Sequence, residues 1–141
     1  MCIRDRNRIH VVQRGSHQDY LHLTRRIDIA LDTFPYNGQT TSYDMLWMGV
    51  PVITLAGQTP ASRLGLGLLA NLGLTDLVAS TPEQYVKIAS GLAANLDRLR
   101  ELRFTLREQM QCSVLMDERA LTARTEAGYR HMWKMWCDRA A

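Results

Sequence analysis

The residues best suited to chemistry form one short stretch in the first third of the chain, Thr33-Phe34-Pro35-Tyr36-Asn37-Gly38-Gln39-Thr40-Thr41. Pro35 fixes the backbone and Gly38 can adopt conformations closed to other residues, so the stretch predicts a rigid turn leading into a helix. The first turn of that helix would expose unpaired amides, which together with the helix dipole form an anion site. The hydroxyls of Thr40 and Thr41 would add two donors, and charge-assisted bonds of this kind contribute about 1.5–3 kcal/mol each. The stretch therefore suits a diphosphate.

Asp44 follows one turn later on the same predicted helix. An ionised carboxylate only accepts hydrogen bonds, so it can take both hydroxyls of a ribose. Phosphates at the helix tip with a ribose one turn along would be a consistent nucleotide geometry. The spacing leaves a second interpretation open: Asn37-Gly38 before two threonines is also an ordinary turn and cap, and Asp44 could simply favour the helix N-terminus.

The elements that would position these residues alternate between strands and helices. Apolar patterns predict strands at residues 9–12, 27–31, 52–55 and 77–79, and helices at 19–26, 40–48, 61–71, 81–92, 96–106 and from about Glu118. Such alternation indicates one α/β domain, a parallel sheet with helices on both faces. Ligands bind beyond the carboxyl ends of such strands, and the second predicted strand ends at Asp32. We therefore expect residues 33–41 to lie in that crevice.

Composition narrows the class of protein. With 46% apolar and 22% charged residues among 141, the chain is typical of a soluble globular domain. The apolar run 45–55 is shorter than the ~20 residues of a membrane span, and we recognise no secretory leader, so a cytoplasmic protein is expected. The net charge of +3 is spread over arginines scattered among acidic residues, which argues against a nucleic-acid binder and suits a phosphate-bearing small molecule. Cys2, Cys112 and Cys137 form no CxxC pair, and we interpret them as free thiols rather than metal ligands.

Three further features receive structural interpretations. Gly65-Leu66-Gly67 is similar to a phosphate loop but lies in a predicted helix without a preceding strand, so we expect close helix packing, with Arg63 facing the crevice. The absence of GxGxxG after a strand argues against a dehydrogenase-type dinucleotide domain. Trp133 and Trp136 on the last helix are interpreted as apolar packing, exposed if the surface they cover is missing.

One segment of the sequence is recognisable as a family pattern. It comprises Asp28-Ile29-Ala30-Leu31-Asp32-Thr33-Phe34-Pro35-Tyr36-Asn37-Gly38, Thr40-Thr41 and the run from Asp44 to Leu55, followed by Ala61-Ser62-Arg63, Leu72-Gly73-Leu74 and Tyr129-Arg130-His131-Met132-Trp133. Over about residues 8 to 136 the chain resembles the O-GlcNAc transferase and SPINDLY proteins, glycosyltransferase family 41. The resemblance implies a GT-B arrangement of two Rossmann-like lobes. It identifies residues 7–141 as an incomplete C-terminal lobe that binds the nucleotide sugar. Residues 1–6 are interpreted separately, from their own sequence, as a non-native scar.

The resemblance also assigns site residues. Gln39, Thr40 and Thr41, in the turn that contains Asn37 and Gly38, are expected at the donor diphosphate. Asp44 is expected at the ribose, while Gly15, His17 and Tyr20 fall where the family holds the base and nearby ribose. The animal pattern has His at position 39, Lys at 17 and His at 20. UDP-GlcNAc is the expected donor, and GDP-fucose, used by plant SPINDLY proteins, is the alternative.

The rest of the family's machinery is expected outside this chain. The tetratricopeptide helices, the N-terminal lobe with its proposed catalytic histidine, and a lysine that meets the donor phosphate find no counterpart in residues 1–141. None of His10, His17, His22 and His131 matches a catalytic-base position. The chain is therefore expected to be the donor-binding part of an enzyme that glycosylates Ser or Thr of proteins, inactive alone, without cofactor or metal. The alternative is a truncated, non-catalytic nucleotide-binding or interaction module.

Overall fold

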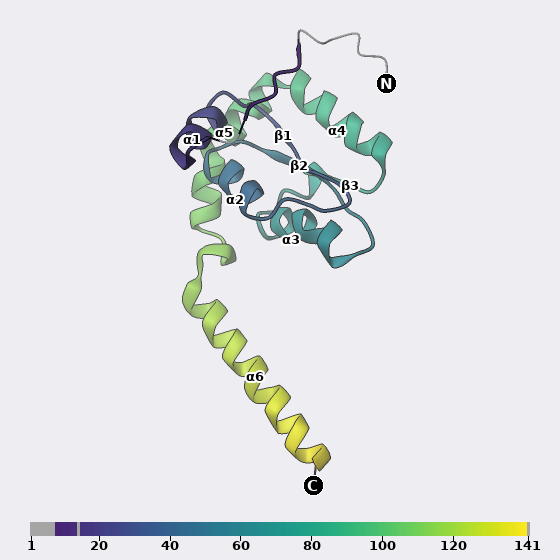
Figure 1. The fold of residues 1–141 in the computed structure, drawn as a ribbon, viewed down its shortest axis with the longest axis vertical. Helices are drawn as coiled ribbons and strands as arrows, with labels where there is room; N and C mark the ends of the chain where they lie inside the picture. Colours follow the sequence, from purple (N-terminus) through teal and green to yellow (C-terminus); the bar gives the residue numbers. More distant parts are fainter. Residues whose placement is uncertain (1–7, 14, 141) are drawn as a thin grey trace.

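The computed structural model describes residues 8–13 and 15–140. Its elements follow the chain in the order shown in Figure 1. They are α1 (His17–Thr24), β1 (Ala30–Leu31), α2 (Thr40–Trp47), β2 (Val52–Leu55), α3 (Leu64–Asn71), β3 (Val78–Ala79), α4 (Pro82–Ala94), α5 (Leu96–Gln111) and α6 (Glu118–Ala140), with 3-10 turns at Pro60–Arg63, Thr75–Leu77 and Val114–Met116. The residues interpreted as a scar, 1–6, lie outside the described part of the chain.

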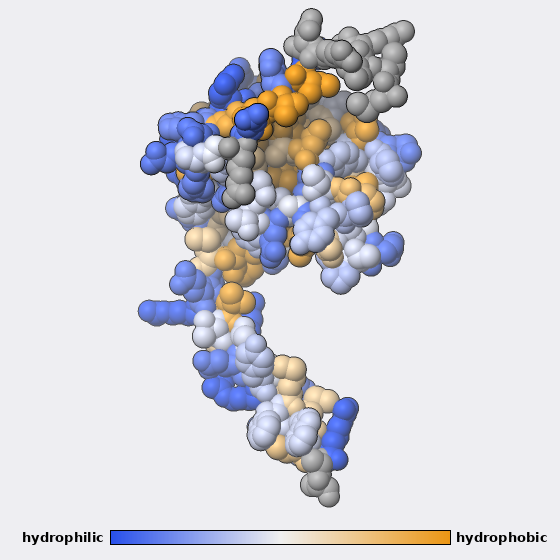
Figure 2. Space-filling view, viewed as in Figure 1, coloured by the Kyte–Doolittle hydropathy of each residue, from blue (hydrophilic) through white to orange (hydrophobic). Residues whose placement is uncertain are grey.

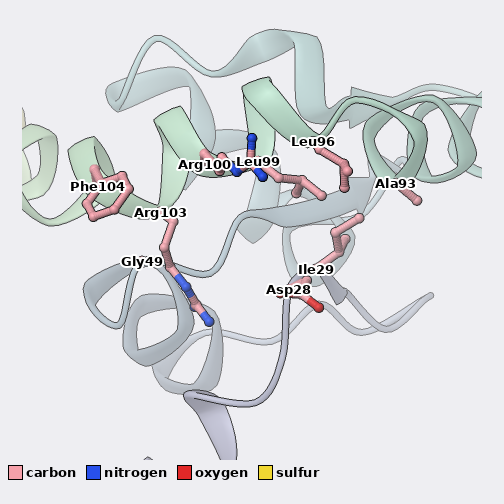
Figure 3. A pocket seen from close by; sticks show the side chains of 9 residues that line it. All are labelled: Asp28, Ile29, Gly49, Ala93, Leu96, Leu99, Arg100, Arg103 and Phe104. Atoms are coloured by element: carbon pink, nitrogen blue, oxygen red, sulfur yellow. The ribbon is translucent and has the colours of Figure 1, made fainter.

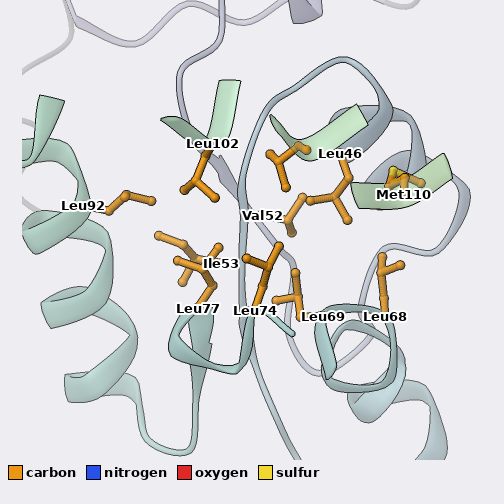
Figure 4. Packing of buried hydrophobic residues seen from close by; sticks show 11 residues of the cluster. Leu46, Val52, Ile53, Leu68, Leu69, Leu74, Leu77, Leu92, Leu102 and Met110 are labelled. Carbon is orange, nitrogen blue, oxygen red and sulfur yellow. The ribbon is translucent and has the colours of Figure 1, made fainter. Parts of the chain in front are cut away.

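A small parallel sheet forms the centre of the body, with its three strands in the order β1-β2-β3. Ala30 lies opposite Val52, and Thr54 opposite Val78. Val52 and Ile53 are buried, as expected of a strand covered on both faces. Helices α3 and α4 both pack against β2, and Figures 1 and 4 show them on opposite sides of it. The predicted α/β fold with a parallel sheet between helices is confirmed.

The core joins the sheet to four helices, as Figure 4 shows. Leu46 of α2, Ile53 of β2, Leu69 of α3 and Leu102 of α5 are fully buried within it, and Leu92 of α4 is nearly so. Each such side chain contributes about 1.5–3 kcal/mol by leaving water. The core therefore holds the ends of β1 and α2, which carry the candidate site, in a fixed relation.

The structure corrects the predicted elements at the start of the chain. Residues 9–12 form no strand, because no described strand pairs with them and a β-branched run alone supplies no ladder of hydrogen bonds. Ile9, Val11 and Val12 are instead exposed. Helix α1 begins at His17 rather than residue 19, since the Ser16 side chain caps it, and β1 is shorter than the predicted 27–31.

Further along the chain the helices predicted at 81–92 and 96–106 are confirmed as α4 and α5. Thr81 caps α4 with Pro82 at its first position. Asn95 separates α4 from α5, and its side chain accepts a hydrogen bond of 3.0 Å from the Arg98 amide. Local signals are therefore enough to delimit these two helices.

Helix α6 stands clear of the body in Figure 2, and the described side chains from Leu121 to Arg139 are all exposed. Trp133 and Trp136 stack on each other with ring centroids 6.2 Å apart, yet 66% and 64% of their surfaces face solvent. The apolar packing expected of this pair is therefore limited, within the described chain, to the contact between the two rings. None of the described helices is long and apolar enough to cross a bilayer. Cys112 and Cys137 are free and exposed, whereas Cys2 lies outside the described residues.

Candidate nucleotide site

The loop after β1 is organised by the carboxylate of Asp32. Its Oδ1 accepts from the amides of Gly38 at 2.7 Å and Thr33 at 3.0 Å, and its Oδ2 accepts from the Thr54 hydroxyl of β2 at 2.8 Å. The Tyr85 hydroxyl of α4 donates to the Asp32 carbonyl at 2.8 Å. These hydrogen bonds attach the loop to the carboxyl ends of the strands, which is where the sequence predicted the ligand-binding crevice.

Asn37 closes this loop from the inside. Its side chain is fully buried; Nδ2 donates to the Thr33 carbonyl at 2.9 Å and Oδ1 accepts from the Gly65 amide at 3.3 Å. A Cβ at Gly38 would lie 2.7 Å from Ser42 Oγ, so glycine permits the close approach that turns the chain into α2. The Phe34–Pro35 peptide bond is cis. The predicted rigid turn is present, and Asn37 serves as its internal support.

Helix α2 begins at Thr40 with no side chain capping its first turn, because the Gln39 side chain makes no capping hydrogen bond. The first turn also carries no acidic residue. Thr40 and Thr41 are exposed at this end of the helix. The first turn of α2 therefore has no capping side chain, and both threonines are exposed beside it, which is the arrangement that an anion site requires.

A cavity of about 600 Å³ lies between α1 and the start of α2. Six of the nine predicted site residues line it together: Gly15, His17, Tyr20, Thr40, Thr41 and Asp44. The remaining wall residues are Val12, Gln13, Ser16, Asp19 and Leu23. The tertiary structure thus unites two parts of the chain that the sequence assigned separately to the phosphate end and the base end.

Ser16 and Asp19 shape the α1 side of the cavity. Asp19 Oδ2 accepts from the Ser16 amide at 3.1 Å and its hydroxyl at 2.7 Å, while Ser16 Oγ accepts from the Asp19 amide at 3.2 Å. The hydrogen bonds from Ser16 hold the pKa of Asp19 below its usual 3.8. Sequence reasoning missed both residues, although Ser-x-x-Asp is a variant of the capping box that marks a helix start.

Tyr20 and Asp44 both line the cavity, Tyr20 from α1 and Asp44 from α2. The phenol oxygen of Tyr20 is buried and has no hydrogen-bond partner within the described chain. Burial raises the pKa of Tyr20 above its ordinary 10.0, and the charge of Asp44 adds to the shift. The His17 ring lies 6.2 Å from the Tyr20 ring, tilted by 31°. The cavity walls thus include two aromatic rings and the carboxylates of Asp19 and Asp44, which suits a ligand with a flat ring and a diol.

The other three predicted residues do not line this cavity. Asn37 is buried inside the loop, and Gln39 is exposed at the helix cap. Gly38 lines a smaller hollow of about 160 Å³ beside Asp32, and Thr41 lines both spaces. The loop residues therefore sit behind the anion site, with Thr41 at the junction.

The predictions made for Gly65, Gly67 and Arg63, in and next to α3, have different outcomes. A Cβ at Gly65 would lie 2.3 Å from Thr54 Oγ1 and 2.7 Å from Asp32 Oδ2, so the predicted close packing is confirmed there. Gly67 has nothing within 4 Å of such an atom, and the same prediction is wrong for it. The Arg63 side chain donates to the Gly57 carbonyl at 3.1 Å, beyond β2, and does not line the cavity.

No group of three or more His, Cys, Asp or Glu side chains in the described residues is arranged to hold a metal ion. What the cavity walls supply is a set of hydroxyl and amide donors at one end and a carboxylate one turn away. Hydroxyl and amide donors can hydrogen-bond a phosphate, and a carboxylate can accept from a diol.

Comparison with known proteins identifies relatives whose names agree with a nucleotide-sugar site. Residues 3–125 match glycosyl transferase family 41. The chain is 44% identical over 120 residues to a probable UDP-N-acetylglucosamine–peptide N-acetylglucosaminyltransferase SPINDLY of Hordeum vulgare, covering 85% of this chain and 13% of that protein. It is 32% identical over 132 residues to a UDP-N-acetylglucosamine–peptide N-acetylglucosaminyltransferase of Caenorhabditis elegans, covering 94% and 12%.

A solved structure extends the likeness to three dimensions. A mutant of Thermobaculum terrenum O-GlcNAc transferase superposes with a TM-score of 0.88 at 42% identity, covering 96% of this chain and 26% of that one. The chain therefore spans only a small part of the proteins it matches. Because the family match covers most of its length and the structural match nearly all of it, the chain belongs to glycosyl transferase family 41, and its fold is that of part of a GT-B glycosyltransferase.

Proposed function

We propose that the cavity between α1 and α2 holds the nucleotide sugar donor of a protein O-glycosyltransferase, UDP-GlcNAc. The observation that carries this proposal is the meeting of Thr40, Thr41 and Asp44 with Tyr20 and His17 around one cavity of about 600 Å³. That size lies within the range of small-molecule sites. The relatives named as UDP-N-acetylglucosamine–peptide transferases support this choice of donor and a peptide acceptor. We infer that the acceptor groups are Ser or Thr hydroxyls.

The diphosphate would lie against the start of α2. The uncapped amides of the first turn and the exposed hydroxyls of Thr40 and Thr41 are donors, and no acidic side chain in that turn opposes an anion. The helix dipole favours negative charge at this end. Gln39, exposed at the cap, could add a donor from its amide group.

The nucleoside would lie toward α1. Asp44 stands one turn from the phosphate end and would accept from both ribose hydroxyls. The rings of His17 and Tyr20 would pack against the base, and Gly15 leaves room beside them.

Transfer itself is proposed for a longer protein that contains this lobe, since the chain spans 13% of its SPINDLY relative. The chain alone is then a donor-binding module without turnover. The exposed free thiols of Cys112 and Cys137 suit a reducing compartment, in keeping with a cytoplasmic enzyme. Turnover by the purified chain with UDP-GlcNAc and a Ser- and Thr-containing acceptor peptide would overturn this part of the proposal.

Calorimetric titration of the chain with UDP, UDP-GlcNAc and GDP-fucose tests the binding proposal. We expect the two uridine ligands to bind, and Asp44→Ala to weaken them by roughly 10-fold or more, because hydrogen bonds to a charged group are lost. Asp138→Ala is the matched control, an exposed carboxylate on α6 remote from the cavity.

Equal binding by the Asp44→Ala variant would refute the ribose assignment, and no binding of any nucleotide would refute the site. Tight binding of GDP-fucose with little response to UDP would indicate that the same site binds GDP-fucose, the alternative donor.

A further inference from the structure

A second cleft lies at the opposite ends of α1 and α2 from the nucleotide cavity. It consists of two hollows, of about 470 and 420 Å³, which adjoin because Gly49, Arg103 and Phe104 line both. Helix α2 has 8 residues, so at 1.5 Å per residue its ends are about 12 Å apart. The cleft and the cavity between α1 and α2 therefore adjoin the same two helices, but no residue lines both of them.

One end of this cleft is lined by three arginines. Arg25 follows α1, while Arg103 and Arg107 lie one turn apart on α5, and Trp47 and Met48 complete the wall. No acidic side chain lines this hollow, and none of the three arginines forms an ion pair within the described chain. The hollow is consequently a concentration of uncompensated positive charge.

The bonds that these arginines do make hold them in place. Arg103 Nη2 donates to the Arg25 carbonyl at 3.1 Å, and Arg107 Nε donates to the Trp47 carbonyl at 3.0 Å. The Arg107 guanidinium also lies 5.1 Å from the Trp47 ring centroid. Capping the last carbonyls of α1 and α2 accounts for these contacts.

Capping does not account for the rest of the Arg103 guanidinium. Its Nη1 is buried and finds no hydrogen-bond partner among the residues that the structure describes. A desolvated charged donor without an acceptor is costly, and a carboxylate matches the guanidinium fork with two parallel bonds. Because Arg103 Nη1 has no accessible surface, an anionic group that enters the hollow would contact the exposed side chains of Arg25 and Arg107.

The other end of the cleft is apolar. Figure 3 shows Ile29, Leu96 and Leu99 around it, with Arg103 reaching past Gly49. Phe104, 82% exposed, stands at the junction of the two hollows. Asp28 lines this end and Arg100 is bonded to Asp97 at 3.3 Å, so a second carboxylate is disfavoured here.

We propose that this cleft docks an acidic segment of another polypeptide. Its carboxylates would pair with Arg25 and Arg107, and a neighbouring apolar side chain would lie against Leu99 and Phe104. The apolar end favours a polypeptide over a nucleic acid, which would require donors or stacking surfaces along a charged stripe. The proposal is independent of what the nucleotide cavity binds.

Fluorescence anisotropy with a labelled peptide of glutamates and leucines tests this docking. A peptide with glutamine at each glutamate controls for the apolar contribution. We expect the glutamate peptide to bind in a salt-sensitive manner, and Arg25→Gln or Phe104→Ser to weaken it roughly fivefold. Both side chains are exposed, so neither variant should unfold the protein. Arg130→Gln on α6 is the matched control for the change of charge and should bind like the unmodified chain.

Three outcomes would overturn the proposal. They are equal binding of the glutamine peptide, unchanged binding by both cleft variants, and saturable binding of an oligonucleotide that Arg25→Gln weakens, in place of the peptide. Sedimentation velocity adds a fourth: a dimer that dissociates in the Arg25→Gln variant would assign the cleft to a second copy of this chain.

Discussion

Some residues of the segment between β1 and α2 hold the loop in shape, and others are available to contact a ligand. The side chains of Asp32 and Asn37 use their oxygens for internal hydrogen bonds. They accept from Gly38, Thr54 and Gly65. Side chains further along, at the start of α2, are left free for a ligand. Neighbours in one motif thus have different roles, which substitutions can separate.

Asn37→Ala should lower the free energy of unfolding by about 2–4 kcal/mol, because it removes two hydrogen bonds and leaves the buried Gly65 amide without an acceptor. Gln39→Ala, at an exposed position, should change it by less than about 0.5 kcal/mol. Urea denaturation of the two variants measures both. A small loss at Asn37 would contradict its role as the internal support of the loop.

Tyr20→Phe should raise the free energy of unfolding by up to about 1 kcal/mol, because the phenol hydroxyl is buried without a partner in the described chain. The same change should leave nucleotide binding nearly unchanged, since the proposed contact with the base is made by the ring, which phenylalanine retains. Urea denaturation and calorimetric titration give the two readouts. A destabilised variant would contradict the unpaired burial of the hydroxyl, and a loss of binding would contradict a contact made by the ring alone.

The ionisation of Tyr20 sets the stability at high pH. Burial, and secondarily Asp44, raises the pKa in the folded state above the ordinary 10.0, so the folded state prefers the neutral phenol. This contribution is fully present below pH 10.0 and is lost as the pH rises through the folded-state pKa. Stability measured at about pH 9 and about pH 11 should fall more in the unmodified chain than in Tyr20→Phe. Tyr85, whose pKa is raised by burial and then by Asp32, accounts for loss that remains in both.

At the scale of elements, the starts of α1 and α2 position the residues that line the cavity between these two helices. Helix α1 begins where Ser16 and Asp19 cap each other, and α2 begins uncapped where the Asp32 loop ends. Helix α3 reaches the sheet because Gly65 has no side chain: its Cα faces Thr54 at the end of β2. Close approach at this one position keeps α3 against the loop.

Gly65→Ala and Gly67→Ala form a matched pair on α3. A methyl at 65 would lie 2.3 Å from Thr54 Oγ1 and should destabilise the fold by about 1–3 kcal/mol as that strand end shifts. A methyl at 67 meets nothing within 4 Å and should stabilise by about 0.5–1 kcal/mol through helix propensity. Thermal unfolding separates the two, and equal effects would contradict the packing at Gly65.

At the scale of the whole molecule, a compact body carries two clefts at opposite ends of α1 and α2, and α6 extends away from it (Figure 1). The described part of α6 from Leu121 onward buries no side chain. The body therefore gains little of its stability from this helix.

Truncation after Ala120 should leave the urea midpoint of the body within error of the full chain, because no buried side chain is removed. It should also remove the exposed Trp133 and Trp136, leaving Trp47 to report unfolding by fluorescence. A fall of more than about 1 kcal/mol in the free energy of unfolding would show that α6 packs on the body in solution.

The sequence by itself determined the local and periodic features of this protein. Strand β2, the caps at Thr81 and Asn95, and the turn leading into Thr40 follow from residue types a few positions apart. The family pattern from Asp28 to Leu55 added the expectation of a nucleotide at Thr40, Thr41 and Asp44. These signals work because capping, turn geometry and helical periodicity are decided within one or two turns of chain.

Tertiary structure alone decided what depends on long-range pairing. Residues 9–12 have strand propensity but no strand to pair with, and propensity cannot supply a partner. Asn37 became a buried support because α3 brings the Gly65 amide to it from 28 positions away. Arg25 and Arg103, scattered in the sequence, meet in one cleft because α5 packs beside the ends of α1 and α2. Burial and charge clustering are properties of the packed chain, so no local pattern could reveal them.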